Sequence, residues 1–390
     1  MHGNNFYIPI NLEGNWSDKH LYIIDKLYTS KFIDKRFSAD STDTFHAHSF
    51  SYTKLNKFQK KALKISYVPL SSVFLRKLLG RNSKTIITEL IHSYVVQSDN
   101  QYIVGEKSKG YRLAPEYSSS SFKTVPIQDM KFKKLIESLR AKEYDSLSPL
   151  HKGMFTVMQN DFSFNSEGAR KYYATHFSEN TSISYQLNVL NEKEYYFSTD
   201  TKTGRVFTNY TNLKREFRSF IQSANGEPLV ELDIRNSQPL LLASLFNEFS
   251  HTSSSEYSCL CEQGIIYDYL SEKTGATRDK VKKDFLTVLF APSHWDTKVK
   301  RIFQSDFPEV FEYVSSIKRD GNNLLALALQ KCEADLVINT IGAQLLFEGI
   351  PFLSVHDSLI VTESQSSYVK DLMTQRFSEQ YNINPIINIK

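Results

Sequence analysis

The chain has 390 residues and a net charge of +4, with 41% hydrophobic and 23% charged residues, a composition typical of a globular protein. This length exceeds what one compact core holds, so we expect two or three domains. No apolar run reaches the roughly 18 residues of a membrane span, and three cysteines without a repeated Cys-x-x-Cys pattern argue against a disulfide framework or a zinc site. We therefore expect a cytoplasmic protein without membrane contact.

The N-terminal part divides into an extension, residues 1–53, and a basic module, residues 54–117. The extension is polar and aromatic without a clear period. Within the module, the segment 54–88 carries nine lysine and arginine residues and no acidic residue. Such a concentration of positive charge is typical of nucleic-acid contact, and a solvated basic face is the alternative.

The order of elements expected in the basic module resembles a winged helix, a common duplex-binding module. Helices are expected at 72–79 and 83–93, because each has an apolar stripe and the first follows a serine cap and precedes a glycine. A hairpin of 94–96 with 102–104 is expected next, and the basic loop after it carries Lys107 and Lys109. A small helical domain without a nucleic-acid ligand remains the alternative.

Two further regions complete the predicted organisation. Residues 125–195 have a helical pattern, typical of a thumb-like element or of a helical brace. Residues 196–390 combine short apolar strands with helices, and an antiparallel sheet backed by helices, an α+β fold, explains this order. Strands are expected at 229–232 and on both sides of residue 357, and helices at 238–249, 266–290, 308–318 and 323–348.

Two aspartates end apolar strands of this C-terminal region. Asp233 follows the strand 228–232, and Asp357 lies between the apolar segments 351–355 and 359–361. Nucleotidyl transfer by two metal ions requires carboxylates that meet from rigid supports, because the ions lie about 3.5–4 Å apart. Each aspartate alone is better explained as a turn residue or a helix cap, so a third element is needed to support a metal site.

That third element is the helix that ends near Phe290. Arg278 and Lys282 are four residues apart and therefore lie on nearly one face of a helix. Two such cations bind a triphosphate, Lys282 can also protonate the leaving pyrophosphate, and Phe290 can stack on an incoming base. A solvated basic helix face is the alternative, since Lys280 and Lys283 are basic too.

Five motifs in register resemble the polymerase superfamily that contains family A DNA polymerases and phage-type single-subunit RNA polymerases. They cover roughly residues 195–365 and lie at 200–207 (with the pattern D-x-x-x-G-R), 217–233, 277–290, 327–335 and 355–358. The resemblance implies a right-hand polymerase with an antiparallel-sheet palm and helical fingers and thumb, in residues 196–390 and 125–195.

The resemblance also implies a role for each matching residue. Asp233 and Asp357 would bind two Mg²⁺ ions, for which Mn²⁺ substitutes, with the backbone carbonyl of Ile234 completing the metal site. The nucleotide-binding residues would be Arg278, Lys282, Phe290 and Gln238. The residues that contact the primer–template would be Arg205, Gln330 and His356, together with Lys107 and Lys109 of the basic module.

Departures from the family pattern leave the choice between dNTPs and NTPs open. Family A DNA polymerases usually carry a glutamate after the first aspartate as a steric gate against ribose, whereas this chain has Asn-Ser-Gln-Pro at 236–239. Ser358 and the spacing within 277–290 resemble the RNA enzymes. Phe290, however, stands where those enzymes use tyrosine, and the loss of a ring hydroxyl there would weaken selection for a 2′-hydroxyl.

The sequence favours a small DNA polymerase that acts on a DNA primer–template with nucleoside triphosphates, in the DNA replication of a phage or mobile element. No segment resembles a proofreading exonuclease. One alternative is an RNA polymerase or primase of the same fold. Another is a catalytically inactive polymerase fold that binds DNA, against which the intact Asp233, Asp357 and Lys282 argue.

Overall fold

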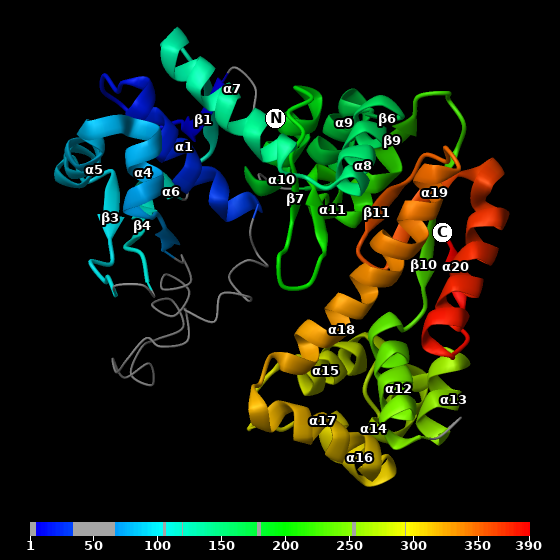
Figure 1. The fold of residues 1–390 in the computed structure, drawn as a ribbon. Helices are drawn as coiled ribbons and strands as arrows, with labels where there is room; N and C mark the ends of the chain where they lie inside the picture. The colour runs from blue at the N-terminus through cyan, green and yellow to red at the C-terminus, as the bar shows by residue number, and fades with distance from the viewer. Residues whose placement is uncertain are drawn as a thin grey trace. The chain divides into compact units, whose positions relative to one another are not determined.

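The computed structural model describes residues 5–33, 67–103, 107–118, 120–177, 181–251, 255–292 and 294–390. The chain forms two compact units (Figure 1): unit 1 is Met1–Ser146 with Ser166–Tyr195, and unit 2 is Leu147–Asn165 with Tyr196–Lys390. The predicted helical region 125–195 is thus divided between the two units. Part of the predicted basic stretch, up to residue 66, lies outside the described residues.

Unit 1 combines two small sheets with helices. β1 (Asn5–Pro9) pairs antiparallel with β5 (Phe122–Pro126), and α1 (Asp18–Ile33) packs against β1. A second sheet has the strand order β2-β4-β3, formed by β2 (Val68–Pro69), β4 (Gly110–Leu113) and β3 (Val96–Ser98). Besides α1, the helices in the described part of this unit are α4 (Ser72–Leu79), α5 (Ser83–His92), α6 (Pro115–Ser118), α7 (Met130–Asp145), α9 (Ser166–His176) and α10 (Thr181–Asn191).

The helices predicted at 72–79 and 83–93 are confirmed as α4 and α5. The Ser71 hydroxyl accepts a hydrogen bond from the Phe74 amide at 3.1 Å and so caps α4, and Gly80 ends the helix with a positive φ of 76°. The apolar stripes of both helices are buried, as is typical of amphipathic helices, except for Val73 of α4, which is 77% exposed. Their buried residues are Leu75, Leu78, Leu79, Ile86, Ile87 and Leu90.

The predicted hairpin of 94–96 with 102–104 is wrong in its second strand. β3 pairs with β4, so that Val96 lies opposite Leu113. The Asp99 carboxylate accepts hydrogen bonds from the Gly110 amide at 2.8 Å and the Gln101 amide at 3.0 Å, which closes the longer loop. Gly110 is needed there, since a Cβ would lie 2.7 Å from the Asp99 carboxylate. Tyr102 suggested a strand by residue type but is 58% exposed.

A buried polar cluster crosses the core of unit 1. The Asp25 carboxylate on α1 accepts a hydrogen bond from the Tyr7 amide at 2.8 Å, and the Tyr7 hydroxyl donates to Glu194 at 3.0 Å. Burial, together with the charge of Glu194, raises the pKa of Asp25 to about 7. The protonated form of Asp25 is therefore favoured in the folded state.

We expect Asp25→Asn to flatten the dependence of stability on pH. Because the pKa of Asp25 rises from 3.8 to about 7 on folding, its contribution is present below pH 3.8 and is lost as the pH rises towards 7. A tenfold change in an ionisation equilibrium corresponds to about 1.4 kcal/mol. The free energy of unfolding of the wild-type protein should therefore fall by more than about 2 kcal/mol over this pH range. Urea denaturation between pH 4 and pH 7 measures it. If the free energy of unfolding changed with pH in the same way for the wild type and Asp25→Asn, the role of Asp25 would be contradicted.

Unit 2 is built around a four-stranded antiparallel sheet of order β11-β12-β10-β13, which confirms the expected sheet. Its strands are β11 (Leu353–Val355), β12 (Ser358–Thr362), β10 (Leu229–Ile234) and β13 (Ile387–Ile389). Four further strands of this unit pair outside the sheet: β6 (Phe162–Phe164) with β9 (Ile221–Ser223), and β7 (Phe197–Thr199) with β8 (Val206–Thr208).

Helices cover the sheet and extend from it. Figure 1 shows α18 (Leu324–Ala334), the π-helical segment Asp335–Gly342 and α19 (Ala343–Phe347) as one continuous rod that joins a helical cluster to the sheet. The cluster consists of α12 (Ser237–Ser250), α13 (Glu256–Glu262), α14 (Ile266–Thr274), α15 (Arg278–Phe290), α16 (Lys298–Asp306) and α17 (Pro308–Asp320). The remaining helices are α8 (Pro149–Asn160), α11 (Asn209–Asn212) and α20 (Ser366–Tyr381).

The helix predicted at 266–290 is two helices. Gly275 adopts a positive φ of 68° and ends α14, and Thr277 begins the next helix, α15. A left-handed residue at this position is the common way to end a helix, and glycine takes it without strain. Because of this break, Arg278 lies in the first turn of α15 and not in the middle of a longer helix. Within the part of the chain that the structure describes, every helix is too short or too polar to cross a bilayer.

Candidate active site

The two predicted aspartates come together at one end of the sheet. Asp233, near the end of β10, lies opposite Ser358 of β12, and Asp357 occupies the turn between β11 and β12. The Ile234 amide donates to the Asp357 carbonyl at 3.3 Å, which ties the strand end to the turn. His356 completes this turn with a positive φ of 59°. The backbone pairing thus fixes both carboxylates on adjacent rigid supports.

Electrostatics show how closely charged groups surround Asp357. Burial is the main reason that its pKa rises to about 7, and the negative charges of Glu333 and Asp233 add to the effect. Lys282 acts in the opposite direction and lowers the pKa of Asp357. Asp233, Asp357 and Lys282, which come from three separate segments, therefore share one electrostatic environment.

The oxygen atoms at this place fit a divalent metal ion of the Mg²⁺ type. Carboxylate and carbonyl oxygens are the ligands that hard cations prefer. The repulsion between Asp357 and Asp233 is one that a cation would relieve, and the Lys390 ammonium already lies 2.6 Å from the Asp233 carboxylate. Among the described residues, no group of three or more His, Cys, Asp or Glu side chains could hold a metal. An ion here would need water or substrate oxygens besides the two carboxylates.

Arg278 lies in the first turn of α15, close to the residues that follow Asp233. Its guanidinium is 3.0 Å from the Asp268 carboxylate and donates to the Asn236 side chain at 3.5 Å. It also lies over the ring of Tyr267, 5.5 Å from the ring centroid. With 41% of its side chain exposed, Arg278 remains accessible to an anionic ligand.

A buried network joins two predicted site residues to a third that the sequence analysis missed. Glu333 on α18 is only 3% exposed. One of its carboxylate oxygens accepts a hydrogen bond from Arg205 at 2.6 Å, and the other accepts from the Gln238 amide. The D-x-x-x-G-R motif forms the turn between β7 and β8, where Gly204 has a φ of 75°, and so presents Arg205 to Glu333. A carboxylate within an apolar helix was the available signal for Glu333.

A second network explains the buried Ser358. Its hydroxyl donates to Glu231 at 3.0 Å, and Glu231 also accepts from Arg218 at 3.1 Å. Glu231 and Asp233 are two residues apart on β10 and therefore lie on the same face of the sheet. The Ser358 hydroxyl thus holds β12 against β10 beside the aspartates.

The remaining predicted site residues lie in α15, in α18, in the turn before Asp357 and in unit 1. Phe290 ends α15 and is half-buried against the core, and Gln330 lies one turn before Glu333 on α18. The ring of His356 packs edge-on against Phe207 with 6.1 Å between ring centroids. In unit 1, Lys107 lies 3.3 Å from the Asp99 carboxylate and Lys109 is exposed. Contacts of these residues with nucleotide or nucleic acid stay predictions.

We expect Glu333→Gln to destabilise unit 2 by about 3 kcal/mol, because breaking a buried ion pair leaves Arg205 uncompensated. The transposed double variant Gln238→Glu/Glu333→Gln returns one carboxylate to the network, at position 238, and should recover part of the loss. Denaturant unfolding of both single variants and the double variant measures the coupling.

The matched control for this cycle is Glu312→Gln. Glu312 pairs with Arg319 at 3.1 Å, but both side chains are more than 60% exposed. Its loss should change stability by less than about 1 kcal/mol. Simple addition of the two single effects in the transposed variant would show that Glu333 and Gln238 act independently.

Comparisons with known proteins add one similar solved structure to this geometry. No family model and no curated protein matches the chain. Among solved structures, the chain is similar to the POL domain of Pol1 from M. smegmatis in complex with DNA primer-template and dNTP, at 11% sequence identity and a TM-score of 0.37. The match covers 65% of this chain and 65% of the length of that structure. A similarity at this level does not establish a shared fold or activity.

Proposed function

We propose that this chain is a template-directed nucleic-acid polymerase that joins nucleotides by two-metal nucleotidyl transfer. The observation that carries the proposal is the meeting of Asp233 and Asp357 at one end of an antiparallel sheet, with Lys282 of α15 near enough for its charge to lower the pKa of Asp357. Two carboxylates from rigid strands and a nearby ammonium are what metal-assisted attack on a triphosphate requires. In this proposal the four-stranded sheet is the palm of a right hand, and the helices α14 to α17 belong to the fingers.

Each residue near the sheet has a defined task in the proposed reaction. Asp233 and Asp357 would hold two Mg²⁺ ions, which Mn²⁺ can replace, with the Ile234 carbonyl as a further ligand. When bound, such ions lower the pKa of a primer 3′-hydroxyl and neutralise charge on the leaving pyrophosphate. Arg278 and Lys282 bind the triphosphate, and Lys282 donates a proton to the pyrophosphate as it leaves.

The remaining residues position the substrates. Phe290 flanks the nascent base pair, and Gln238 lies beside the sugar of the bound nucleotide. The primer–template contacts Gln330, His356 and Arg205. The Arg205 guanidinium is held by Glu333 at 2.6 Å, so Arg205 acts through a fixed orientation rather than as a mobile surface charge.

DNA synthesis is the activity that we propose first, by a small enzyme of the family A type without a proofreading exonuclease. RNA synthesis, as a polymerase or primase, is the second candidate. It is favoured by Gln238, which stands where a glutamate would exclude ribose. Ser358 does not decide between them, because its hydroxyl is bonded to Glu231 at 3.0 Å.

Primer extension by the purified chain tests the proposal. With a labelled DNA primer–template, Mg²⁺ or Mn²⁺, and dNTPs or NTPs in separate reactions, we expect extension in the dNTP reaction. Asp357→Asn should lower the rate by about 1000-fold, because loss of a metal ligand removes several kcal/mol of stabilisation from the transition state.

Asp335→Asn is the matched control, since Asp335 is an exposed aspartate on the helical rod, bonded to Asn339 and Gln380. It should retain wild-type extension. Extension with NTPs alone would support the second candidate. Retained DNA binding without extension on primed, unprimed and hairpin templates would contradict polymerase activity.

Unit 1 supplies a second part of the proposal, a winged-helix module that binds duplex DNA. The elements β2, α4, α5, β3 and β4 follow one another in this order with the sheet order β2-β4-β3, and the loop before β4 carries Lys107 and Lys109. A basic loop at the tip of such a hairpin suits contact with phosphates.

We expect Lys109→Glu to weaken duplex binding and to lower the salt dependence of the binding constant by about one unit of slope, since one phosphate contact is lost. Lys109 is preferred to Lys107, which already pairs with Asp99 at 3.3 Å. Lys142→Glu, an exposed lysine on α7, is the control. Fluorescence anisotropy at several salt concentrations measures both. An unchanged slope in Lys109→Glu would exclude this loop from the duplex contact.

A further inference from the structure

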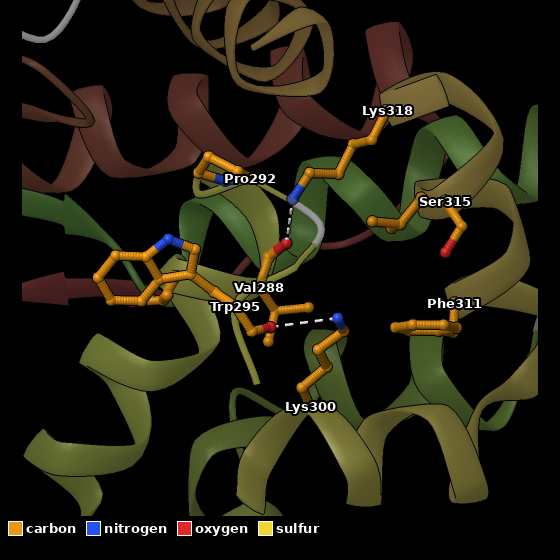
Figure 2. Close-up of a pocket in the computed structure, with 9 residues that line it drawn as sticks. Val288, Pro292, Trp295, Lys300, Phe311, Ser315 and Lys318 are labelled. Carbon is orange, nitrogen blue, oxygen red and sulfur yellow. Dashed lines mark hydrogen bonds between the residues drawn. The ribbon is translucent and has the colours of Figure 1, made fainter. Parts of the chain in front are cut away.

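A pocket in the helical cluster of unit 2 lies apart from the residues assigned above (Figure 2). It is enclosed by the last turns of α15, the residues that follow them, α16 and α17. Its lining residues are Thr287, Val288, Pro292, Trp295, Lys300, Phe311, Val314, Ser315 and Lys318. The lining thus contains two lysines and two aromatic rings and no acidic residue.

Lys318 has a buried ammonium group, and the hydrogen bond that it donates uses only one of its N–H donors. It is 6% exposed, and its Nζ donates to the Val288 carbonyl at 2.7 Å. Val288 lies in the last turn of α15, so this bond caps the end of that helix. The cap uses one of the three N–H donors of the ammonium. None of the residues that the structure describes forms an ion pair with Lys318.

Lys300 brings a second positive charge to the same space. Its Nζ donates to the Trp295 carbonyl at 3.2 Å and lies 5.9 Å from the centroid of the Phe311 ring. Figure 2 shows the two ammonium groups directed into the pocket from opposite sides. Burial, with the charge of Lys300 added, lowers the pKa of Lys318 to about 8. Two cations held this way are stabilised by an anion between them.

Trp295 shows what kind of anion fits. Its indole is 56% exposed at the rim of the pocket, and in Figure 2 it points away from the two lysines. An inorganic anion would use the ammonium groups but would leave this large apolar ring in water. A nucleotide unit uses both features, because its phosphate binds cations and its base stacks on an aromatic face.

We propose that this pocket binds an unpaired nucleic-acid strand, with a phosphate between Lys300 and Lys318 and an adjoining base stacked on Trp295. The Ser315 hydroxyl, which also lines the pocket, adds a further donor to the phosphate. Binding here needs neither Asp233 nor Asp357, so the site is independent of the proposed catalysis. A polymerase and an inactive strand-binding protein would both have it.

Tryptophan fluorescence gives a direct test, because the chain has only two tryptophans. In a Trp16→Phe background, Trp295 is the sole reporter. We expect oligothymidylate to quench its fluorescence in the absence of divalent metal, and a labelled strand to bind with the same affinity by anisotropy. Asp357→Asn should leave both unchanged, which separates this site from the polymerase activity.

Four variants probe the pocket itself. Lys300→Met and Lys318→Met should each weaken oligothymidylate binding at least tenfold and reduce the salt slope by about 0.7, since each removes one contact with the phosphate of a single strand. Trp295→Ala, a change at an exposed side chain, should weaken strand binding at least fivefold without loss of the fold. Lys318→Arg keeps the charge and the helix cap, and should retain binding if Lys318→Met does not fold.

Lys370→Met, on α20, is the matched control and should bind as the wild type does. The proposal is overturned if oligothymidylate binds without quenching Trp295, or if Trp295→Ala and Lys300→Met bind it with wild-type affinity. Quenching by inorganic phosphate as strong as that by oligothymidylate would also overturn it, because the pocket would then be a simple anion site.

Discussion

The pairing of β10 with β12 is the interaction on which the candidate site depends. Its register places Asp233 opposite Ser358 and so brings the strand end against the turn that holds Asp357. A slip of one residue would move Asp233 to the other face of the sheet, because side chains alternate along a strand. The bond from Ser358 to Glu231, on the same face as Asp233, fixes this register with a side chain as well as with the backbone.

Charge around this strand pair is balanced at Glu333 and Asp233 but not at Asp357, whose pKa is raised to about 7. Glu333 is nearly inaccessible, and Arg205 and Gln238 occupy both of its oxygens. The Asp233 carboxylate is neutralised by Lys390, and Lys282 favours the ionised form of Asp357. A cation that binds between the aspartates would replace Lys390 as the partner of Asp233.

Local sequence patterns predicted what depends on local chemistry. The serine cap of α4, the apolar stripes of α4 and α5, and the apolar strands that lead to Asp233 and Asp357 were all readable from neighbouring residues. Contacts between residues far apart in the sequence could not be predicted in this way. The partners of Glu333 are 128 and 95 residues away, so the carboxylate looked like an ordinary helix residue. The second strand of the hairpin in unit 1 was missed because the side chain of Asp99, rather than the strand residues, sets where the loop closes.

The most direct test of the central claim, that Asp233 and Asp357 form one metal site, is Mn²⁺ binding measured by electron paramagnetic resonance. The wild-type protein should bind Mn²⁺, and Asp233→Asn and Asp357→Asn should each weaken that binding at least tenfold, or by about 1.4 kcal/mol. The double variant should be little worse than either single one, since both carboxylates serve the same site. Wild-type Mn²⁺ affinity in either single variant would contradict the claim.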